Sequence, residues 1–427
     1  MKFELKKNNL LALSSLPILA KESGAKRIDI LNTCNKDDLV CFCESLPLIL
    51  PILDWEEDFE VWLHDMPYCL FGPNCHDHIL VGKEGEKREA CQACKFFKIC
   101  SGFPKGYFEK YGDEELKPIV DKPMEVMIEA ETKCNFLCKF CFNKLSFAKK
   151  GRDLLGLSSE EIKKIIKGVS EAGIEIVRFT GGEPLLRKDI LELMQFARDL
   201  NLQVWLNTNA SLIDENLACK LVPLVDNFLI PIESYDNDKE GEITGHKNSL
   251  NKKIVALKYL EKAGAKKVRV GTVAISENIE EFSQLSDFVL SLPIDEWEFY
   301  WPVGEKADKE LLEKLTDNII KLKDKTDKFI TIANSVPFCT IDNSYKLNLV
   351  CRGAIFENGH SRLVIDPRGF VKPHYFVEKN IGEPGDIMSA WNSSEMKALR
   401  NLELLPEECE TCRFKFKCRG GNSSIKN

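Results

Sequence analysis

Between about residues 123 and 325 the chain alternates regularly between strand-like and helix-like runs, and this alternation constrains the fold most. Short apolar runs are typical of buried parallel strands, and the runs between them have the spacing of amphipathic helices. Strand then helix, repeated six times, implies parallel strands with right-handed crossovers and an α/β fold. The expected strands are Met124–Ala130, Glu175–Phe179, Gln203–Asn207, Asp226–Ile232, Lys267–Val273 and Glu296–Trp301. The expected helices are Ser159–Ala172, Asp189–Asn201, Ile213–Val222, Leu250–Gly264, Ile279–Leu290 and Lys309–Lys323.

Length and charge narrow the class of protein. The 427 residues are enough for two or three domains with cores of their own. The net charge of −8 and the lack of a long basic tract make a nucleic-acid partner unlikely in this chain. No apolar run reaches the 18 residues of a membrane-spanning helix. Leu10–Ala20 is apolar, but Glu4, Pro17 and the lack of a small-residue cleavage site argue against a signal peptide, so we expect a cytoplasmic protein.

Cysteine is unusually abundant and clustered. Seventeen cysteines occur, eight of them before position 101 and five between 339 and 418. An odd number in closely spaced groups, without a signal peptide, favours metal or cluster ligation over disulfides. Reduced thiols in cores are the alternative, which suits Cys219 on an expected helix.

Three cysteines, Cys134, Cys138 and Cys141, directly follow the first expected strand. A four-iron cluster normally takes four thiolates, so three ligands suggest a cluster with one iron open to a ligand other than protein. In folds of parallel strands and helices, the loops after the strands carry the chemistry. The position of this stretch therefore suits a catalytic cluster.

The loop after the second expected strand reads Thr-Gly-Gly-Glu-Pro, residues 180–184. Gly181 and Gly182 allow positive φ and close backbone approach, Glu183 offers a carboxylate, and Pro184 stiffens the turn. The loop could be a plain strand-to-helix connection. Because the loop follows a parallel strand at the same end as the three clustered cysteines, we interpret it as a site for an amino-acid ammonium group.

The two motifs in this strand order resemble the radical S-adenosylmethionine (radical SAM) superfamily, over roughly residues 123–325. The resemblance implies a partial (β/α)6 TIM-like barrel, in which Cys134, Cys138 and Cys141 hold a 4Fe–4S cluster and SAM chelates the open iron. It also implies an electron donor such as flavodoxin or ferredoxin, and cleavage of SAM to a 5′-deoxyadenosyl radical. The SAM contacts that the resemblance implies are Phe140, Gly181, Gly182, Glu183, Pro184, Asn207, Thr208, Asn209, Glu233 and Ser234.

The C-terminal region resembles the SPASM/twitch type of extension. Val364–His374 is similar to the small β-hairpin of that extension, and the expected domain spans residues 335–427, after a radical SAM core at 120–325. His374 stands where a cysteine is usual, and could be a ligand, a proton donor or a hairpin residue. The resemblance implies two auxiliary clusters, but His374 replaces a cysteine and no cysteine follows Cys418 in this sequence. We therefore expect one auxiliary cluster, with ligands Cys351, Cys409, Cys412 and Cys418.

Residues 1–115 are expected to form a separate cysteine-rich domain. Arg27–Leu31 alternates like a short strand, whereas Pro47 and Pro51 argue against a regular helix in the apolar stretch that follows.

A cysteine triplet in this region repeats the C-terminal pattern. Cys91, Cys94 and Cys100 have the same C-x2-C-x5-C spacing as the last three cysteines of the chain. Cys69 or Cys75 could be the fourth ligand, with His76 and His78 in reserve. An iron–sulfur cluster and a structural zinc both fit this pattern. Cys34, Cys41 and Cys43 could form a further, weaker site.

These features predict a radical SAM enzyme that oxidatively modifies a peptide, protein or peptide-derived substrate with help from auxiliary clusters. The alternatives are heme, tetrapyrrole or other cofactor biosynthesis, and more remotely a non-enzymatic zinc-bound interaction protein. No catalytic acid, base or radical relay is identified, because Tyr235, His246, Tyr300 and Trp301 suit structural roles equally well.

Overall fold

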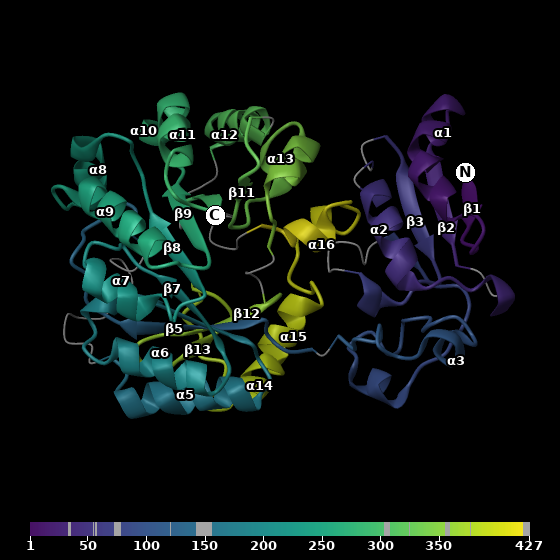
Figure 1. Ribbon diagram of the computed structural model, residues 1–427, viewed down its shortest axis with the longest axis horizontal. Helices are drawn as coiled ribbons and strands as arrows, with labels where there is room; N and C mark the ends of the chain where they lie inside the picture. Colours follow the sequence, from purple (N-terminus) through teal and green to yellow (C-terminus); the bar gives the residue numbers. More distant parts are fainter. Residues whose placement is uncertain are drawn as a thin grey trace. The chain divides into compact units, whose positions relative to one another are not determined.

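The computed structural model divides into two compact units, Met1–Asp121 and Lys122–Asn427 (Figure 1). The three predicted domains stay a prediction; the expected core and C-terminal regions both fall within the second unit. None of the described helices has the length and apolarity that crossing a membrane requires. The residues described are 1–32, 36–53, 55, 58–71, 78–119, 121–141, 156–302, 308–323, 325–354, 359–375 and 377–421.

The N-terminal unit contains a four-stranded parallel sheet in the order β1-β2-β3-β4. Its strands are β1 (Lys2–Glu4), β2 (Arg27–Leu31), β3 (Glu60–His64) and β4 (Ile79–Leu80). Its α-helices are α1 (Leu16–Glu22), α2 (Phe42–Leu53) and α3 (Tyr107–Tyr111). Ile28 and Ile30 of β2 pack with Ile49 and Phe42 of α2 in one apolar core. The predicted strand at Arg27–Leu31 is confirmed.

The expectation that prolines exclude a regular helix is wrong for α2. Pro47 and Pro51 both lie inside it, on its exposed side. The opposite side buries Phe42, Ile49 and Ile52 in the core. A proline removes one helical hydrogen bond, and burial of three large side chains outweighs that loss.

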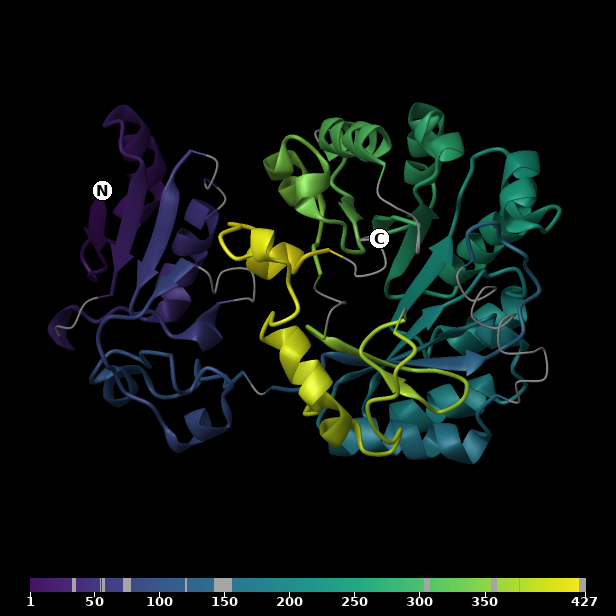
Figure 2. The same ribbon diagram turned by 180° about the vertical axis from the view of Figure 1, so that it is seen from behind.

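The second unit is the expected α/β partial barrel. Its first six strands, β5 to β10, are neighbours in sequence order and pair in parallel. They are β5 (Glu125–Glu131), β6 (Ile176–Gly181), β7 (Gln203–Asn207), β8 (Asn227–Pro231), β9 (Val268–Val273) and β10 (Glu296–Tyr300). Figures 1 and 2 show the helices along the outside of this curved sheet. They are α5 (Ser159–Glu171), α6 (Ile190–Asp199), α7 (Glu215–Leu221), α8 (Asn237–Thr244), α9 (Ser249–Lys262), α10 (Ser276–Ile279), α11 (Phe282–Leu290) and α12 (Lys309–Lys323).

Further strands extend this sheet at both edges. β11 (Phe329–Ile332) pairs with β10, and β12 (Arg362–Ile365) pairs in parallel with β5. β13 (Val371–Lys372) runs antiparallel to β12, which confirms the expected hairpin. The hairpin thereby covers the exposed backbone edge of the first barrel strand. The remaining α-helices are α13 (Ser344–Val350), α14 (Ile387–Trp391), α15 (Ser394–Arg400) and α16 (Lys415–Cys418).

A buried ion-pair group joins three neighbouring strands of this sheet. Glu125 of β5 accepts hydrogen bonds from Arg178 of β6 at 2.7 Å and from Arg362 of β12. Burial opposes the charge of Glu125, but the two arginines lower the pKa of its carboxyl below the usual value. The hairpin is therefore tied to the barrel by charge as well as by backbone pairing.

Candidate functional site

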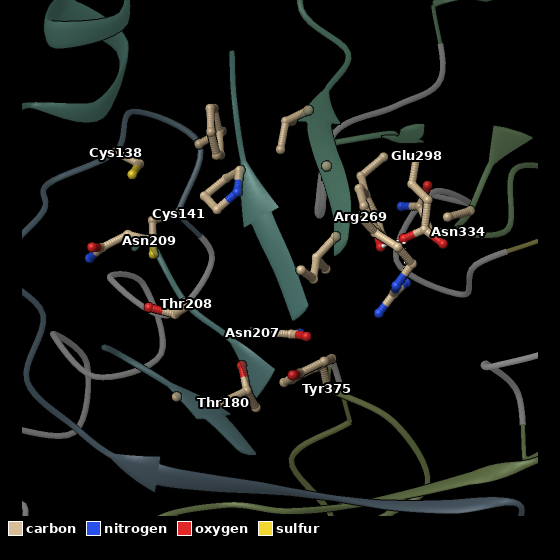
Figure 3. Close-up of a pocket in the computed structure, with 18 of the residues that line it drawn as sticks. Cys138, Cys141, Thr180, Asn207, Thr208, Asn209, Arg269, Glu298, Asn334 and Tyr375 are labelled. Carbon is tan, nitrogen blue, oxygen red and sulfur yellow. Dashed lines mark hydrogen bonds and ion pairs between the residues drawn. The ribbon is translucent and has the colours of Figure 1, made fainter. Parts of the chain in front are cut away.

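The three-cysteine loop after β5 borders a cavity of about 340 Å³ at the carboxyl ends of the barrel strands. Cys134, Cys138 and Cys141 all line this cavity, and Figure 3 shows Cys138 and Cys141 at one side of it. The end of α8 holds the loop in place, because the amides of Leu137 and Lys139 donate to Thr244 and Ile243, each at 2.9 Å.

The environment of these thiols opposes free thiolates. Partial burial raises the pKa of Cys138 to about 12, and Glu233, Cys141 and Cys134 add to the rise while Lys253 opposes it. Burial likewise raises the pKa of Cys134, whose sulfur accepts a hydrogen bond from the Phe136 amide at 3.4 Å. Thiolates here need a compensating cation, and the iron atoms of a cluster would supply it.

The Gly-Gly-Glu-Pro loop approaches the cysteine loop so closely that only glycine fits at two positions. Gly181 has φ +131°, and a Cβ there would collide with the Glu131 carbonyl oxygen. A Cβ at Gly182 would collide with the Lys133 carbonyl oxygen, next to Cys134. Both glycines line the cavity. Their backbone is thereby placed beside the three cysteines.

The carboxylate of Glu183 is used within the protein. It accepts hydrogen bonds from the Thr208 hydroxyl and the Asn209 amide, both at 2.7 Å, and from the Leu185 amide at 3.0 Å. Burial raises the pKa of Glu183 to about 6, although these three donors favour its charged form. Glu183 therefore fixes the loop after β7. Its predicted contact with the SAM ammonium group stays a prediction, as do the contacts of Pro184 and Ser234, which do not line the cavity in the part of the chain described.

The loop after β7 presents three polar side chains to the same cavity, and Figure 3 shows them in a row. Asn207 accepts from Arg178 at 3.3 Å, and Asn209 donates to the side chain of Asn135, inside the cysteine loop, at 2.8 Å. Asn207, Thr208 and Asn209 thus line the same cavity as the three cysteines, and their contacts with SAM stay a prediction.

The loop after β8 contributes a second buried carboxylate. Oε2 of Glu233 accepts from the Val273 amide at 2.8 Å, while its other oxygen, Oε1, has no hydrogen-bond partner within the described ranges. Burial and the nearby charge of Glu240 raise the pKa of Glu233 to about 8, against the effect of Lys253. Glu233 lines the cavity, so its Oε1 is a free polar group at this end of the site. Phe140 lines the cavity as well.

The far end of the cavity holds a charged group that the sequence interpretation missed. Arg269 of β9 is 3% exposed and donates to Asn227 and Glu298, each at 2.7 Å. Its Nη2 has no hydrogen-bond partner among the described residues. Arg352 also donates to Glu298, at 2.6 Å. Figure 3 shows Arg269 and Glu298 across the cavity from the labelled cysteines. The sequence signal that could have revealed this group is an arginine within an otherwise apolar strand. Burying its charge costs free energy unless a protein group or a ligand pairs with it.

A tyrosine from the C-terminal region reaches the same cavity. Tyr375 lines it and hydrogen-bonds with Thr180, and Figure 3 shows both beside Asn207. Burial raises the pKa of Tyr375, so the phenol stays protonated at neutral pH. No local sequence pattern predicts this position, because pairing of β12 with β5 determines it.

The proposed C-terminal cluster ligands come from two segments that contact each other. The Ala354 amide donates to the Lys417 carbonyl at 2.8 Å, which joins the segment after Cys351 to α16. Burial raises the pKa of Cys351 to about 11, and the nearby Cys418 contributes to the rise. Cys409 and Cys412 lie on the turn that precedes α16.

Two further side chains bear on this region. Cys339 was not assigned a role from the sequence. Burial is the main cause of the raised pKa of the Cys418 thiol, and the nearby Cys339 adds to this rise. His374 is buried, and burial together with Lys372 lowers its pKa to about 4. His374 is therefore neutral at pH 7, a form that can ligate a metal, and its ligation stays a prediction.

The N-terminal candidates separate into two groups. Cys69, Cys91, Cys94 and Cys100 line one small cavity. Among the other candidates, His78 bonds to the Val61 carbonyl at 2.9 Å, and Cys34, Cys75 and His76 lie outside the described residues. Cys41 and Cys43 form a disulfide, contrary to the expectation of metal ligation, although their sulfurs and a carboxylate oxygen of Glu115 lie within 4.8 Å of one another.

Comparisons with known proteins agree with this geometry. A family model described as the radical SAM superfamily matches residues 130–289. The PqqA peptide cyclase of Bradyrhizobium diazoefficiens is 24% identical over 311 residues, which cover 69% of this chain and 79% of that protein. A probable GTP 3′,8-cyclase of Sulfurisphaera tokodaii is 34% identical over 200 residues, which cover 46% of this chain and 62% of that protein.

Solved structures support the same fold. Streptococcus suis SuiB bound to S-adenosylmethionine superposes with a TM-score of 0.57 at 19% identity, covering 72% of this chain and 74% of SuiB. Native anSMEcpe with bound AdoMet superposes with a TM-score of 0.56 at 18% identity, covering 71% of this chain and 90% of that chain.

A partial barrel with three cysteines after its first strand and a Gly-Gly-Glu-Pro turn after its second defines a class of iron–sulfur enzymes that bind SAM. Residues 130–289 are a radical SAM superfamily domain, and the protein is a radical SAM enzyme. The cofactors of this class are SAM and a 4Fe–4S cluster, and the non-enzymatic alternative is without support.

Proposed function

We propose that this radical SAM enzyme oxidatively modifies a peptide, a protein or a peptide-derived molecule inside the barrel cavity. The observation that carries the proposal is one continuous cavity of about 340 Å³, bordered by the three cysteines at one end and by Arg269 and Glu298 at the other. The names of similar proteins add support, since they include a PqqA peptide cyclase and a SuiB structure with the precursor peptide SuiA.

The residues at the cysteine end fit the cofactors of this class. Cys134, Cys138 and Cys141 would hold the cluster, leaving one iron for the amino and carboxylate groups of SAM. When bound, the two cofactors together supply a 5′-deoxyadenosyl radical that removes a hydrogen atom from the substrate. The backbone of Gly181 and Gly182 would border the methionine portion of SAM. The remaining proposed contacts are Phe140, Glu183, Pro184, Asn207, Thr208, Asn209, Glu233 and Ser234.

The opposite end of the cavity suits an oxygen atom of the substrate. Nη2 of Arg269 is buried without an acceptor in the part of the chain that the structure describes, and leaving such a donor unpaired costs about 1–3 kcal/mol. A substrate carboxylate or peptide carbonyl would satisfy it. The substrate atom that loses hydrogen would then lie between this anchor and the cysteine end.

We propose one auxiliary iron–sulfur cluster in the C-terminal region, with Cys351, Cys409, Cys412 and Cys418 as its ligands. Cys351 and Cys418 are buried, and amides donate to both sulfurs, from Gly353 at 3.3 Å and from Phe338 at 3.4 Å. Amide hydrogen bonds of this kind stabilise thiolates and tune cluster potentials. Such a cluster could accept the electron that the substrate radical releases when it is oxidised.

The test begins with protein purified without oxygen. It should be brown and, after reduction in the presence of SAM, should form 5′-deoxyadenosine. The mass of a candidate peptide should fall by that of two hydrogen atoms during the reaction. A colourless, zinc-loaded protein that forms no 5′-deoxyadenosine would contradict the proposal.

Arg269→Lys tests the substrate anchor. Loss of a charged hydrogen bond should raise KM for the substrate about tenfold or more, while 5′-deoxyadenosine formation without substrate persists. Arg198→Lys is the matched control, because Arg198 pairs with Asp226 away from the cavity.

A second candidate substrate is a cofactor precursor such as a nucleotide. The 34% identity to a probable GTP 3′,8-cyclase over 200 residues favours it. Conversion of GTP by the purified enzyme, with no change in any peptide, would favour this alternative over peptide modification.

A further inference from the structure

Four cysteines of the N-terminal unit line a single cavity, although they come from three places in the sequence. Cys69 lies in the short 3-10 helix Tyr68–Leu70 that follows β3. Cys91 and Cys94 lie at a second 3-10 turn, and Cys100 follows six residues later. Four cysteines gathered in one cavity form a complete set of ligands for a metal site.

The surrounding packing holds these three segments together. The rings of Tyr68 and Phe96 stack with their centroids 4.5 Å apart, which joins the segment of Cys69 to the segment of Cys94. The Lys95 amide donates to the Ile119 carbonyl at 2.8 Å. The cavity walls are mostly apolar and include Pro67, Phe97, Phe103, Leu116 and Pro118. Four thiols in an apolar cavity have little reason to gather there unless they share a ligand.

Backbone amides point at two of the sulfurs, as they do at the other two cysteine sites. The Gly102 amide donates to Cys100 at 3.3 Å, and the Lys117 amide hydrogen-bonds to Cys69. Gly102 has φ +82°, and a Cβ there would collide with the Glu86 carbonyl oxygen. Amides that donate to sulfur favour the thiolate form that metals and clusters require.

The spacing of the sulfurs favours an iron–sulfur cluster over a single zinc ion. A tetrahedral zinc with Zn–S bonds of about 2.3 Å places its sulfurs about 3.8 Å apart. Within the described part of the chain, no three of the four sulfurs lie within 4.8 Å of one another. The same is true of Cys134, Cys138 and Cys141 in the barrel. A cubane attaches each cysteine to a different iron atom and therefore holds its sulfurs further apart than one zinc ion does.

We propose that Cys69, Cys91, Cys94 and Cys100 bind a four-iron iron–sulfur cluster in the N-terminal unit. Each thiol loses its proton on ligation. Because all four irons carry a cysteine, this cluster has no open iron, and it serves electron transfer or local stability and does not bind SAM. The inference does not depend on the substrate proposed for the barrel.

The first test measures iron, zinc and acid-labile sulfide in the anaerobically purified full chain. Cys91→Ser/Cys94→Ser should contain about four irons fewer per chain than the parent, with the corresponding loss of intensity in the Mössbauer spectrum. Cys219→Ser is the matched control, because Cys219 is exposed on α7, and it should keep the iron of the parent. Formation of 5′-deoxyadenosine, measured in the same samples, reports separately on the barrel site.

A second variant decides the question if the first fails to fold. Replacing the other seven proposed ligands with alanine should leave about four irons per chain, all of them in the N-terminal unit. Unchanged iron in Cys91→Ser/Cys94→Ser, one zinc per chain that disappears with those cysteines, or an iron-free seven-alanine protein would each overturn the proposal. The seven positions are Cys134, Cys138, Cys141, Cys351, Cys409, Cys412 and Cys418.

Discussion

The cysteine sites of the barrel and of the N-terminal unit differ in the number of thiols and in the nature of their walls. The barrel loop offers three cysteines beside a large cavity that polar side chains also line. The N-terminal site offers four cysteines in a small, mostly apolar cavity. Three cysteine ligands leave one iron of a four-iron cluster free to bind a small molecule, whereas four cysteines ligate all four irons. Ligand number and cavity size together distinguish a reactive cluster from a closed one.

The scaffolds of the two sites differ as well. In the barrel, loops after adjacent parallel strands meet, and Glu183 bonds the second loop to the third. In the N-terminal unit, two of the ligand segments are irregular turns held by aromatic stacking and single amide bonds. Substitutions in the barrel should therefore affect chemistry most strongly.

The largest effect is expected for Cys138→Ala. Removing one of three cluster ligands should reduce 5′-deoxyadenosine formation to background, because no other cysteine of the described loop can replace it. Liquid chromatography of the reduced reaction measures the product. Cys219→Ala, on the exposed side of α7, should keep the parent rate. If Cys138→Ala still formed 5′-deoxyadenosine, the barrel loop would not hold the cluster that binds SAM.

Gly182→Ala should have the next largest effect. Its Cβ would collide with the Lys133 carbonyl oxygen, so the two loops must separate, and we expect SAM affinity to fall at least about tenfold. Equilibrium binding of SAM to the cluster-loaded protein measures this change. Gly156→Ala is the matched control, because its Cβ would meet only the Thr132 methyl group, at 3.7 Å. Equal affinity in the two variants would show that close loop approach is not required.

Glu125→Gln tests the ion pairs that join the hairpin to the barrel. It leaves Arg178 and Arg362 without their buried anion, and should lower the free energy of unfolding by about 3–5 kcal/mol at pH 7. The pKa of Glu125 is lowered in the folded state, so its contribution is present above the unfolded-state pKa of about 4.3 and is lost as the pH falls through the folded value.

The pH dependence supplies the control for this variant. The difference between parent and Glu125→Gln in urea denaturation should narrow as the pH falls below about 4. Glu261→Gln, at an exposed position of α9, should match the parent throughout. A constant difference at all pH values would mean that the effect does not come from the charge.

The smallest effect is expected in the N-terminal unit, for Pro47→Ala. Alanine restores an amide that can donate within α2, on its exposed side, so the free energy of unfolding should rise by up to about 1 kcal/mol. Part of the gain is offset because the unfolded chain becomes more flexible. Thermal denaturation of the full chain measures it, and a fall in stability would mean that the proline is required by its neighbours.

The two units also differ in how many of their strands could be predicted from the sequence. The six barrel strands were predicted within two residues at each end, because repeated burial on both sides of a parallel sheet produces a strong periodic signal. In the N-terminal unit only β2 was predicted as a strand. β1 and β4 are three and two residues long, too short for a periodic signal, whereas the five-residue β3 was missed. In α2 the local rule for proline was overridden by burial of its opposite side.

The family, the partial barrel and the loops that carry Cys134–Cys141 and Gly181–Pro184 could be predicted from the sequence, because these depend on local spacing and strand order. Which distant residues meet became clear from the packing of the folded chain alone. That packing gathered Cys69 with Cys91, Cys94 and Cys100, and brought Tyr375 into the barrel cavity through pairing of β12 with β5. Periodicity reports which side of an element is buried, whereas contacts between distant segments depend on packing that no local pattern encodes.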